Sequence, residues 1–191
     1  MRTRRLLQLA CLAVATAARA DEEVPARTRA LVLLRVLAYD RKLSARVGTA
    51  EVTVVVVFRA GDTRSESDSR ALASAIDEAA RDFRVGGRRP RAVLAPWRDE
   101  VDLAARLAAE HAAALWVADD LDDQVGPISR VTRARSVLSF SPRRKHVRDG
   151  LAVAITGGGA RAGIVVNLQA TRAEGADLEA PLLGIAEVIG P

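Results

Sequence analysis

Apolar positions along the chain follow two alternating spacings. Residues 51–58, EVTVVVVF, are almost all apolar and mostly β-branched, which is typical of a strand covered on both faces. Residues 27–43 and 67–83 instead place apolar side chains three or four positions apart, as a helix with one buried face does. Strands that alternate with helices of this length imply crossover connections. The pattern therefore predicts a largely parallel sheet.

The rest of the chain extends this alternation and then departs from it. We expect strands at 91–97, 113–118 and 136–141, and helices at 99–112 and 122–134, the second one broken near Gly126 and Pro127. After Pro142, two apolar strands, 151–156 and 164–168, are separated only by a glycine-rich segment, and residues 177–189 have amphipathic helical spacing. The prediction is an α/β fold with three layers, α/β/α: a mostly parallel sheet, a C-terminal β-hairpin and a final amphipathic helix.

The first twenty residues have the order of a secretory signal peptide. Three arginines precede an apolar run at residues 6–18, and Ala18-Arg19-Ala20 is a small-residue cleavage site followed at once by Asp21. We expect cleavage between Ala20 and Asp21, a periplasmic mature protein, and a single α/β domain over residues 21–191. An uncleaved anchor is the main alternative.

Removal of this segment changes the charge balance. The chain has 29 basic and 24 acidic residues, and four of the arginines but none of the acids lie in residues 1–20. The mature chain would carry 25 basic and 24 acidic residues, so its net charge is about +1 and a nucleic-acid partner is not expected. The one cysteine, Cys11, leaves with the signal, which excludes a disulfide or a thiolate metal site.

The segment TGGGARAG, residues 156–163, allows two interpretations. A phosphate-binding glycine loop leads from a strand into a helix, so that backbone amides point at the anion. Here both flanks are apolar strands, and neither the dinucleotide-binding spacing nor a Gly-Lys-Ser/Thr sequence is present. The pattern favours a hairpin turn, in which glycine permits the required backbone angles.

Four aspartates are the strongest candidates for ligand or cation binding. They follow an expected strand, at the carboxyl edge of the sheet where α/β folds bind ligands. The alternative is that one of them caps the next helix and the others are solvated. The four are Asp119, Asp120, Asp122 and Asp123.

No pattern of residues in the sequence indicates a catalytic site or a cofactor site. His111 and His146 are isolated, and two histidines without cysteine rarely form a transition-metal site. No serine has the strand-to-helix context of a nucleophile. We therefore expect neither an enzyme nor a bound cofactor.

The C-terminal third, residues 136–189, resembles the closing region of the YfiR-like periplasmic proteins. The resemblance lies in a strand, a short segment, a glycine-containing hairpin, and a pattern of spaced apolar and small residues. Glu179 and Ala180 stand where that family usually has paired serines, and the mature chain lacks the cysteines that many members carry. The pattern is carried by Val166, Asn167, Ala170, Gly175, Leu178, Leu182, Leu183 and Ala186.

This resemblance implies a periplasmic regulator. Such a protein would bind the periplasmic region of a membrane-bound sensor, a diguanylate cyclase or a histidine kinase, and in the first case would restrain cyclic di-GMP signalling and biofilm formation. A homodimer is a further expectation. The alternative is a periplasmic solute-binding or transport-accessory protein, with a small ligand held near Asp119–Asp123.

Overall fold

The computed structural model describes residues 24–47, 51–158 and 161–190. The predicted signal peptide and its cleavage point between Ala20 and Asp21 lie outside these residues, so both stay predictions. Within the described part of the chain, no helix combines the length and the apolar character that crossing a membrane requires.

The described strands form one sheet in the order β2-β1-β3-β4-β5-β6-β7. Strands β1 to β5 are parallel to one another, β6 is antiparallel to β5, and β7 is parallel to β6. This arrangement confirms the mostly parallel sheet and the C-terminal hairpin. The strands are β1 (Glu51–Phe58), β2 (Arg89–Pro96), β3 (Ala112–Val117), β4 (Leu138–Ser141), β5 (Val153–Gly158), β6 (Arg161–Asn167) and β7 (Glu187–Ile189).

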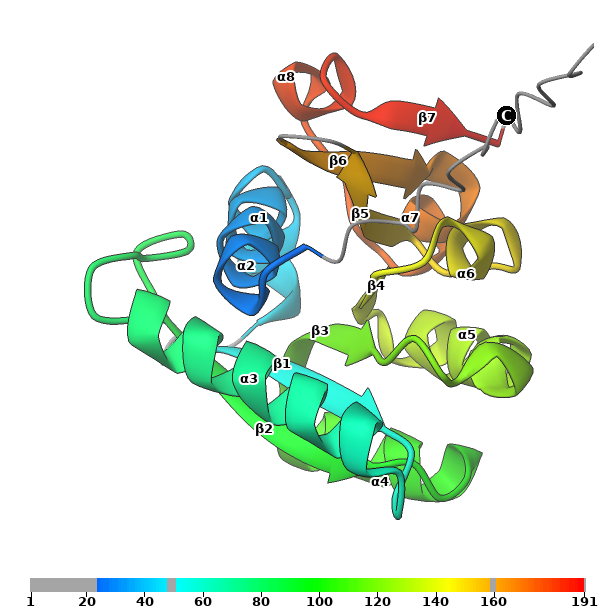
Figure 1. Cartoon of the computed structure of the whole chain (residues 1–191). Coiled ribbons are helices and arrows are strands. Elements are labelled where there is room, and N and C mark those ends of the chain that lie inside the picture. The colour runs from blue at the N-terminus through cyan, green and yellow to red at the C-terminus, as the bar shows by residue number, and fades with distance from the viewer. Residues whose placement is uncertain (1–23, 48–50, 159–160, 191) are drawn as a thin grey trace, which may run out of the picture.

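Helices cover both faces of the sheet, which confirms the three layers (Figure 1). Helices α1 and α3 pack on one face, and α4, α5 and α6 pack on the other. The helices are α1 (Ala26–Ala38), α2 (Leu43–Arg46), α3 (Thr63–Ala79), α4 (Glu100–Ala109), the 3-10 turn η1 (Asp122–Gln124), α5 (Val125–Arg135), α6 (Arg144–Arg148), α7 (Leu168–Ala173) and α8 (Ala180–Leu183).

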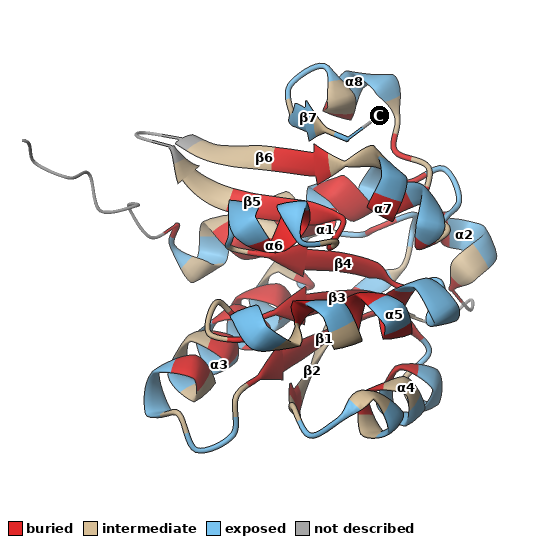
Figure 2. Ribbon diagram, turned by 90° about the vertical axis from the view of Figure 1, so that its right-hand side faces the viewer, coloured by how far each residue is buried: buried red, intermediate tan, exposed pale blue. Residues whose placement is uncertain are grey.

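Strand β1 holds the two helical layers together. Its even-numbered valines, such as Val54, belong to the apolar cluster under α1 and α3, whereas Val55 and Val57 belong to the cluster under α4 and α5. Successive side chains of a strand point to opposite faces, so this run supplies both cores at once. Figure 2 shows the result, with buried central strands between helices whose outer sides are exposed.

The end of the chain differs from the sequence prediction. In place of one amphipathic helix over residues 177–189, the structure has the four-residue α8 followed by strand β7. Ile185 is 76% exposed and Val188 is 41% exposed, so the helical spacing of these side chains does not correspond to a buried face. Strand β7 pairs with β6 over residues 165–167. Without it, the backbone groups of β6 would remain unpaired at the sheet edge, which is the physical reason for the change.

A second correction concerns the helix predicted at 122–134. The change of helical geometry occurs between Gln124 and Val125, where η1 gives way to α5. Gly126 and Pro127 lie inside the first turn of α5 and do not break it. Proline is tolerated there because the first backbone N–H groups of a helix have no partner within the helix.

Glu174 links the segment after α7 to α5 and to strand β4 through hydrogen bonds. It follows α7 and is fully buried between α5 and β4. Its carboxylate accepts hydrogen bonds from Thr132 Oγ1 at 2.6 Å, Ser139 Oγ at 2.7 Å and the Ser139 backbone N–H at 2.8 Å. Burial nevertheless raises the pKa of Glu174 to about 7, because these hydrogen bonds offset only part of the cost of removing a charge from water.

This raised pKa makes stability depend on pH. Between pH 4.5 and about 7 the folded protein keeps the Glu174 proton while the unfolded chain releases it, so the free energy of unfolding falls as pH rises. We expect this contribution to reach about 3 kcal/mol, and Glu174→Gln to remove it. Chemical denaturation across this pH range would measure the difference between the two proteins. The exposed Glu78→Gln variant is the matched control, and parallel pH curves for wild type and Glu174→Gln would contradict the prediction.

Candidate functional site

A cavity of about 560 Å³ opens at the carboxyl ends of β3 and β5. Its walls come from segments far apart in the sequence: the start of α1, the start of α3, the segment after β4 and the outer part of β5. We call it the edge cavity. The edge cavity is lined by Val24, Arg29, Arg64, Ser65, Asp68, Ser69, Trp116, Ala118, Asp119, Pro142, Arg143, Arg144, Lys145, Ile155, Thr156 and Gly157.

The topology of the sheet explains this position. Parallel strands end at the same edge, so the loops after β1, β3 and β4 meet there. The chain leaves β1 toward β2 on one side and then crosses to β3 on the other, which makes the boundary between β1 and β3 the point where the strand order reverses. Open α/β sheets bind ligands in the crevice at such a point.

Arg29 and Trp116 form the inner part of the edge cavity. Arg29 comes from α1 and is only 7% exposed, and Trp116 comes from β3 and is 2% exposed. The guanidinium carbon of Arg29 lies 5.8 Å from the centre of the Trp116 ring, within the range of a cation–π interaction. The ring thus holds a buried cation against an apolar floor.

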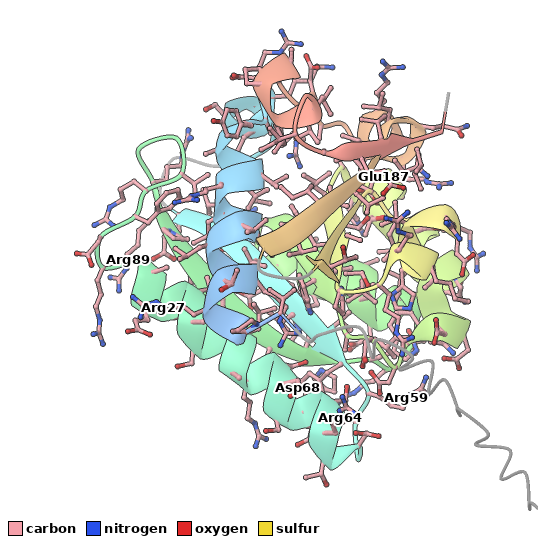
Figure 3. All side chains as sticks on the ribbon, turned by 45° about the horizontal axis from the view of Figure 1, so that its top comes forward. Arg27, Arg59, Arg64, Asp68, Arg89 and Glu187 are labelled. Carbon is pink, nitrogen blue, oxygen red and sulfur yellow. The ribbon has the colours of Figure 1, made fainter. Side chains whose placement is uncertain are left out.

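The start of α3 forms the outer part of the same wall. Asp62 caps the helix by accepting the backbone N–H of Ser65 at 2.8 Å. Arg64 and Asp68 follow in the first turns, with 3.8 Å between their charged groups. Figure 3 shows these two side chains together at this end of α3, close to Arg59. Both charges therefore border the cavity at its rim.

The opposite wall consists of basic residues whose acidic partners mostly lie outside the lining. Arg144 forms a two-point ion pair with Glu187 of β7. Lys145 contacts Asp149 at 2.8 Å and Asp122 at 3.3 Å. None of these three carboxylates lines the edge cavity, whereas both cations do. The wall consequently presents the positive member of each pair to the cavity.

Behind this wall lies a chain of hydrogen bonds that joins a serine, a histidine and an aspartate. Ser141 Oγ is 2.6 Å from Nδ1 of His146, and Nε2 of His146 is 3.1 Å from Oδ1 of Asp122. Ser141 Oγ also accepts the backbone N–H of Arg143 at 3.1 Å. Sequence analysis treated His146 as isolated and missed this chain, because the fold brings Asp122 from 24 positions away.

The burial of the serine and the histidine in this series of hydrogen bonds indicates a structural role. Ser141 and His146 are fully buried and neither lines the edge cavity, so a substrate there would not meet the hydroxyl. Burial lowers the pKa of His146 although Asp122 favours its charged form, and a neutral ring with its proton on Nε2 accepts from Ser141 and donates to Asp122. The hydrogen bonds thereby hold the residues 142–145 that form the basic wall.

The four aspartates predicted as ligand or cation candidates do not converge. Asp119 lies 3.6 Å from Arg143, and Asp120 accepts a hydrogen bond from Ser65 at 2.9 Å. Asp123 lies 2.5 Å from Arg59, while Asp122 contacts Lys145 and His146 as described. Among the residues that the structure describes, no three His, Cys, Asp or Glu side chains are grouped to hold a metal ion.

Each of these carboxylates therefore already has a polar or positive neighbour, an arrangement that favours an ion-paired edge over a cation site. The predicted helix cap is absent at this point, since no side chain of the described residues caps η1 or α5. Only Asp119 lines the edge cavity. Ligand binding by this group of four stays a prediction.

The glycine segment lies between two antiparallel strands, as the hairpin interpretation predicts. Residues 159–160, between the two strands in the sequence, lie outside the described part of the chain. Gly163 is opposite Thr156, and a Cβ at position 163 would come within 3.0 Å of Thr156 Oγ1. Glycine at this position leaves space for Thr156, which lines the edge cavity together with Gly157.

Arg29 and Trp116 are the site residues that sequence analysis did not find. One signal was available for Arg29. It occupies the same helical face as Leu33 and Val36, four and seven positions later, and all three are buried. A charged residue on an apolar face requires a partner or a ligand. Trp116 offered no such signal, because an apolar strand residue is equally consistent with an ordinary core position.

We expect Ser141→Ala to destabilise the fold by about 1–3 kcal/mol, because the change leaves the buried Nδ1 of His146 and the part-buried backbone N–H of Arg143 without this hydrogen-bond partner. Chemical denaturation at neutral pH measures this loss. Ser67→Ala on the exposed side of α3 is the control and should change stability little. Equal stability of the two variants would contradict the structural role of Ser141.

The fold is similar to those of several solved structures. No family model matches the chain, and no curated protein matches it. A conserved domain protein from Vibrio cholerae and an ABC domain in complex with L-Trp from Streptococcus pneumoniae each superpose with a TM-score of 0.61 and 13% identity over 86% of this chain. A substrate-binding protein with adhesive properties from Clostridium difficile, in its ligand-free open form, gives a TM-score of 0.54 and 14% identity over 78% of this chain.

The chain spans 60% of the length of the first two neighbours and 57% of the third. At such low identity the likeness establishes the fold alone, an α/β architecture.

Proposed function

We propose that this chain is an exported solute-binding protein that holds a small molecule in the edge cavity. The observation that carries the proposal is the cavity itself, which has a buried arginine and tryptophan at its inner end and lies at the carboxyl edge of a parallel sheet. Sites of this kind combine an apolar floor with a few polar groups that orient the ligand. A volume of about 560 Å³ is within the range of small-molecule sites.

The structural neighbours support the same class of function. One is described in complex with L-Trp, and another as a substrate-binding protein in its ligand-free open form. An amino acid has the size and the mixture of charged and apolar groups that the edge cavity offers, so amino acids belong in the first set of molecules to test. Export by the predicted signal peptide would place the protein where solutes are captured.

The regulatory role implied by the YfiR-like resemblance is the second proposal, and it is the less supported one. It requires a protein partner, namely the periplasmic region of a diguanylate cyclase or a histidine kinase. Part of the sequence pattern behind it falls in residues 177–189, where the structure has α8 and β7 in place of a helix. Deletion of the gene should raise intracellular cyclic di-GMP if a cyclase is restrained, and unchanged levels would count against that partner.

The two tryptophans allow ligand binding to be located. Trp116 lines the edge cavity, whereas Trp97 packs in the apolar cluster on the other face of the sheet. In Trp97→Phe the remaining tryptophan fluorescence comes from Trp116 and reports on the edge cavity. In Trp116→Phe it comes from Trp97 and reports on the opposite face of the sheet. We expect a bound amino acid or other small metabolite without an indole ring to change the emission of Trp97→Phe in a saturable manner and to leave that of Trp116→Phe unchanged.

Isothermal titration calorimetry with wild type would give the affinity and would extend the test to indole compounds such as L-Trp. Absence of binding across a panel of amino acids, organic acids, sugars and polyamines would contradict the proposed function. A saturable change confined to the emission of Trp97 would place the ligand elsewhere and would contradict the assignment of the site.

A further inference from the structure

The charges of the edge cavity are arranged asymmetrically. Among the residues that the structure describes, five basic side chains line it, against two carboxylates, those of Asp68 and Asp119. The acidic partners of the wall residues Arg144 and Lys145 lie behind them, outside the lining. Charge pairs oriented in this way favour an anionic group at the wall, because the cations are nearer to a bound molecule than their acidic partners are. The five are Arg29, Arg64, Arg143, Arg144 and Lys145.

Two further features of the edge cavity also favour an anionic ligand. The first turn of the 17-residue α3 contributes Arg64 and Ser65 to the lining, and the N-terminal end of a helix carries a partial positive charge. Arg29 is 7% exposed, so its charge acts in surroundings from which most water is excluded. Attraction between charges is stronger there than at an exposed site.

The inner end of the cavity is also apolar. The ring of Trp116 lies beside Arg29, and Ile155, Ala118, Val24 and Pro142 add apolar side chains to the lining. A ligand that fills the site therefore needs an anionic group to face the arginines and an apolar body to cover the ring. An inorganic anion or a sugar would satisfy only one of these requirements.

We propose that the ligand of the edge cavity is a small organic acid, whose carboxylate or phosphate lies near Arg29 and Arg64 and whose apolar part lies on Trp116 and Ile155. This inference rests on the proposed solute-binding function and names the chemical class of the solute. Guanidinium groups suit either anion, because their parallel N–H groups can donate two hydrogen bonds to one carboxylate or phosphate.

Matched ligands test the requirement for a negative charge. Calorimetry would compare 3-phenylpropionate with 3-phenylpropionamide, L-Trp with L-tryptophanamide, and phenyl phosphate with phenol. We expect the anionic member of at least one pair to bind on the order of 10- to 100-fold more tightly than its uncharged or less acidic counterpart, the range expected for a charge-assisted hydrogen bond. The carboxylate and phosphate arms identify which anion is preferred.

Matched variants then test the position of the anion. Arg29→Met should reduce the affinity for the acid at least tenfold, while Arg27→Met, an exposed change on the same helix whose side chain lies apart from Arg64 and Asp68 in Figure 3, should not. Arg29 is buried, and its replacement could impair folding. A second pair of variants therefore changes Thr156, another residue of the lining, and one of the two adds a negative charge there. Thr156→Glu should weaken binding of the acid at least fivefold relative to Thr156→Gln, which has the same size without the charge.

The outcomes separate this inference from the function on which it rests. If the amides or other neutral molecules bind in the cavity as tightly as the acids, and Thr156→Glu equals Thr156→Gln, the charge assignment is overturned while solute binding stands. If the Trp97→Phe and Trp116→Phe emission and calorimetry detect no ligand of any charge, both are overturned. Tight binding of an acid that is unaffected by Arg29→Met and by Thr156→Glu also overturns the inference, because the anion would then lie elsewhere.

Discussion

The parallel alignment of β1 through β5 is the constraint from which the other features follow. It requires a sheet covered on both faces, and the valines of β1 meet this requirement by supplying apolar side chains to both cores. It also brings the loops after several strands to a single edge. The residues that form the edge cavity, from positions 24 to 157, are neighbours only because of this alignment. The core and the site are thus two results of one topology.

Much of this architecture could be predicted from local patterns. The run EVTVVVVF identifies a central strand because no other element accommodates so many adjacent β-branched apolar residues, and the flanks of the glycine segment identify a hairpin. The end of the chain could not be predicted in this way. Residues 185–189 have helical spacing, yet β6 needs a pairing partner, and that need comes from the assembled sheet and is not visible in the segment itself.

The site was less predictable than the fold for the same reason. The carboxyl edge of the sheet could be identified from the order of strands, and the aspartates at 119–123 do lie there. What each of them contacts depends on Arg59, Arg143 and Lys145, which come from two other segments. The chain from Ser141 through His146 to Asp122 likewise exists only in three dimensions. Such a combination is often interpreted as catalytic, but here the burial of Ser141 and His146 makes it a support for the wall of the cavity.

The position of Val24 has a practical consequence for work on this protein. This residue lies two positions before the start of α1 and lines the edge cavity. A purification tag or reporter fused shortly ahead of Val24 would begin close to a residue of the cavity lining. Strands β6 and β7 run back toward the opposite edge of the sheet, so a fusion placed after Ile189 starts away from that lining. Recombinant material for binding studies is better labelled at its C-terminal end.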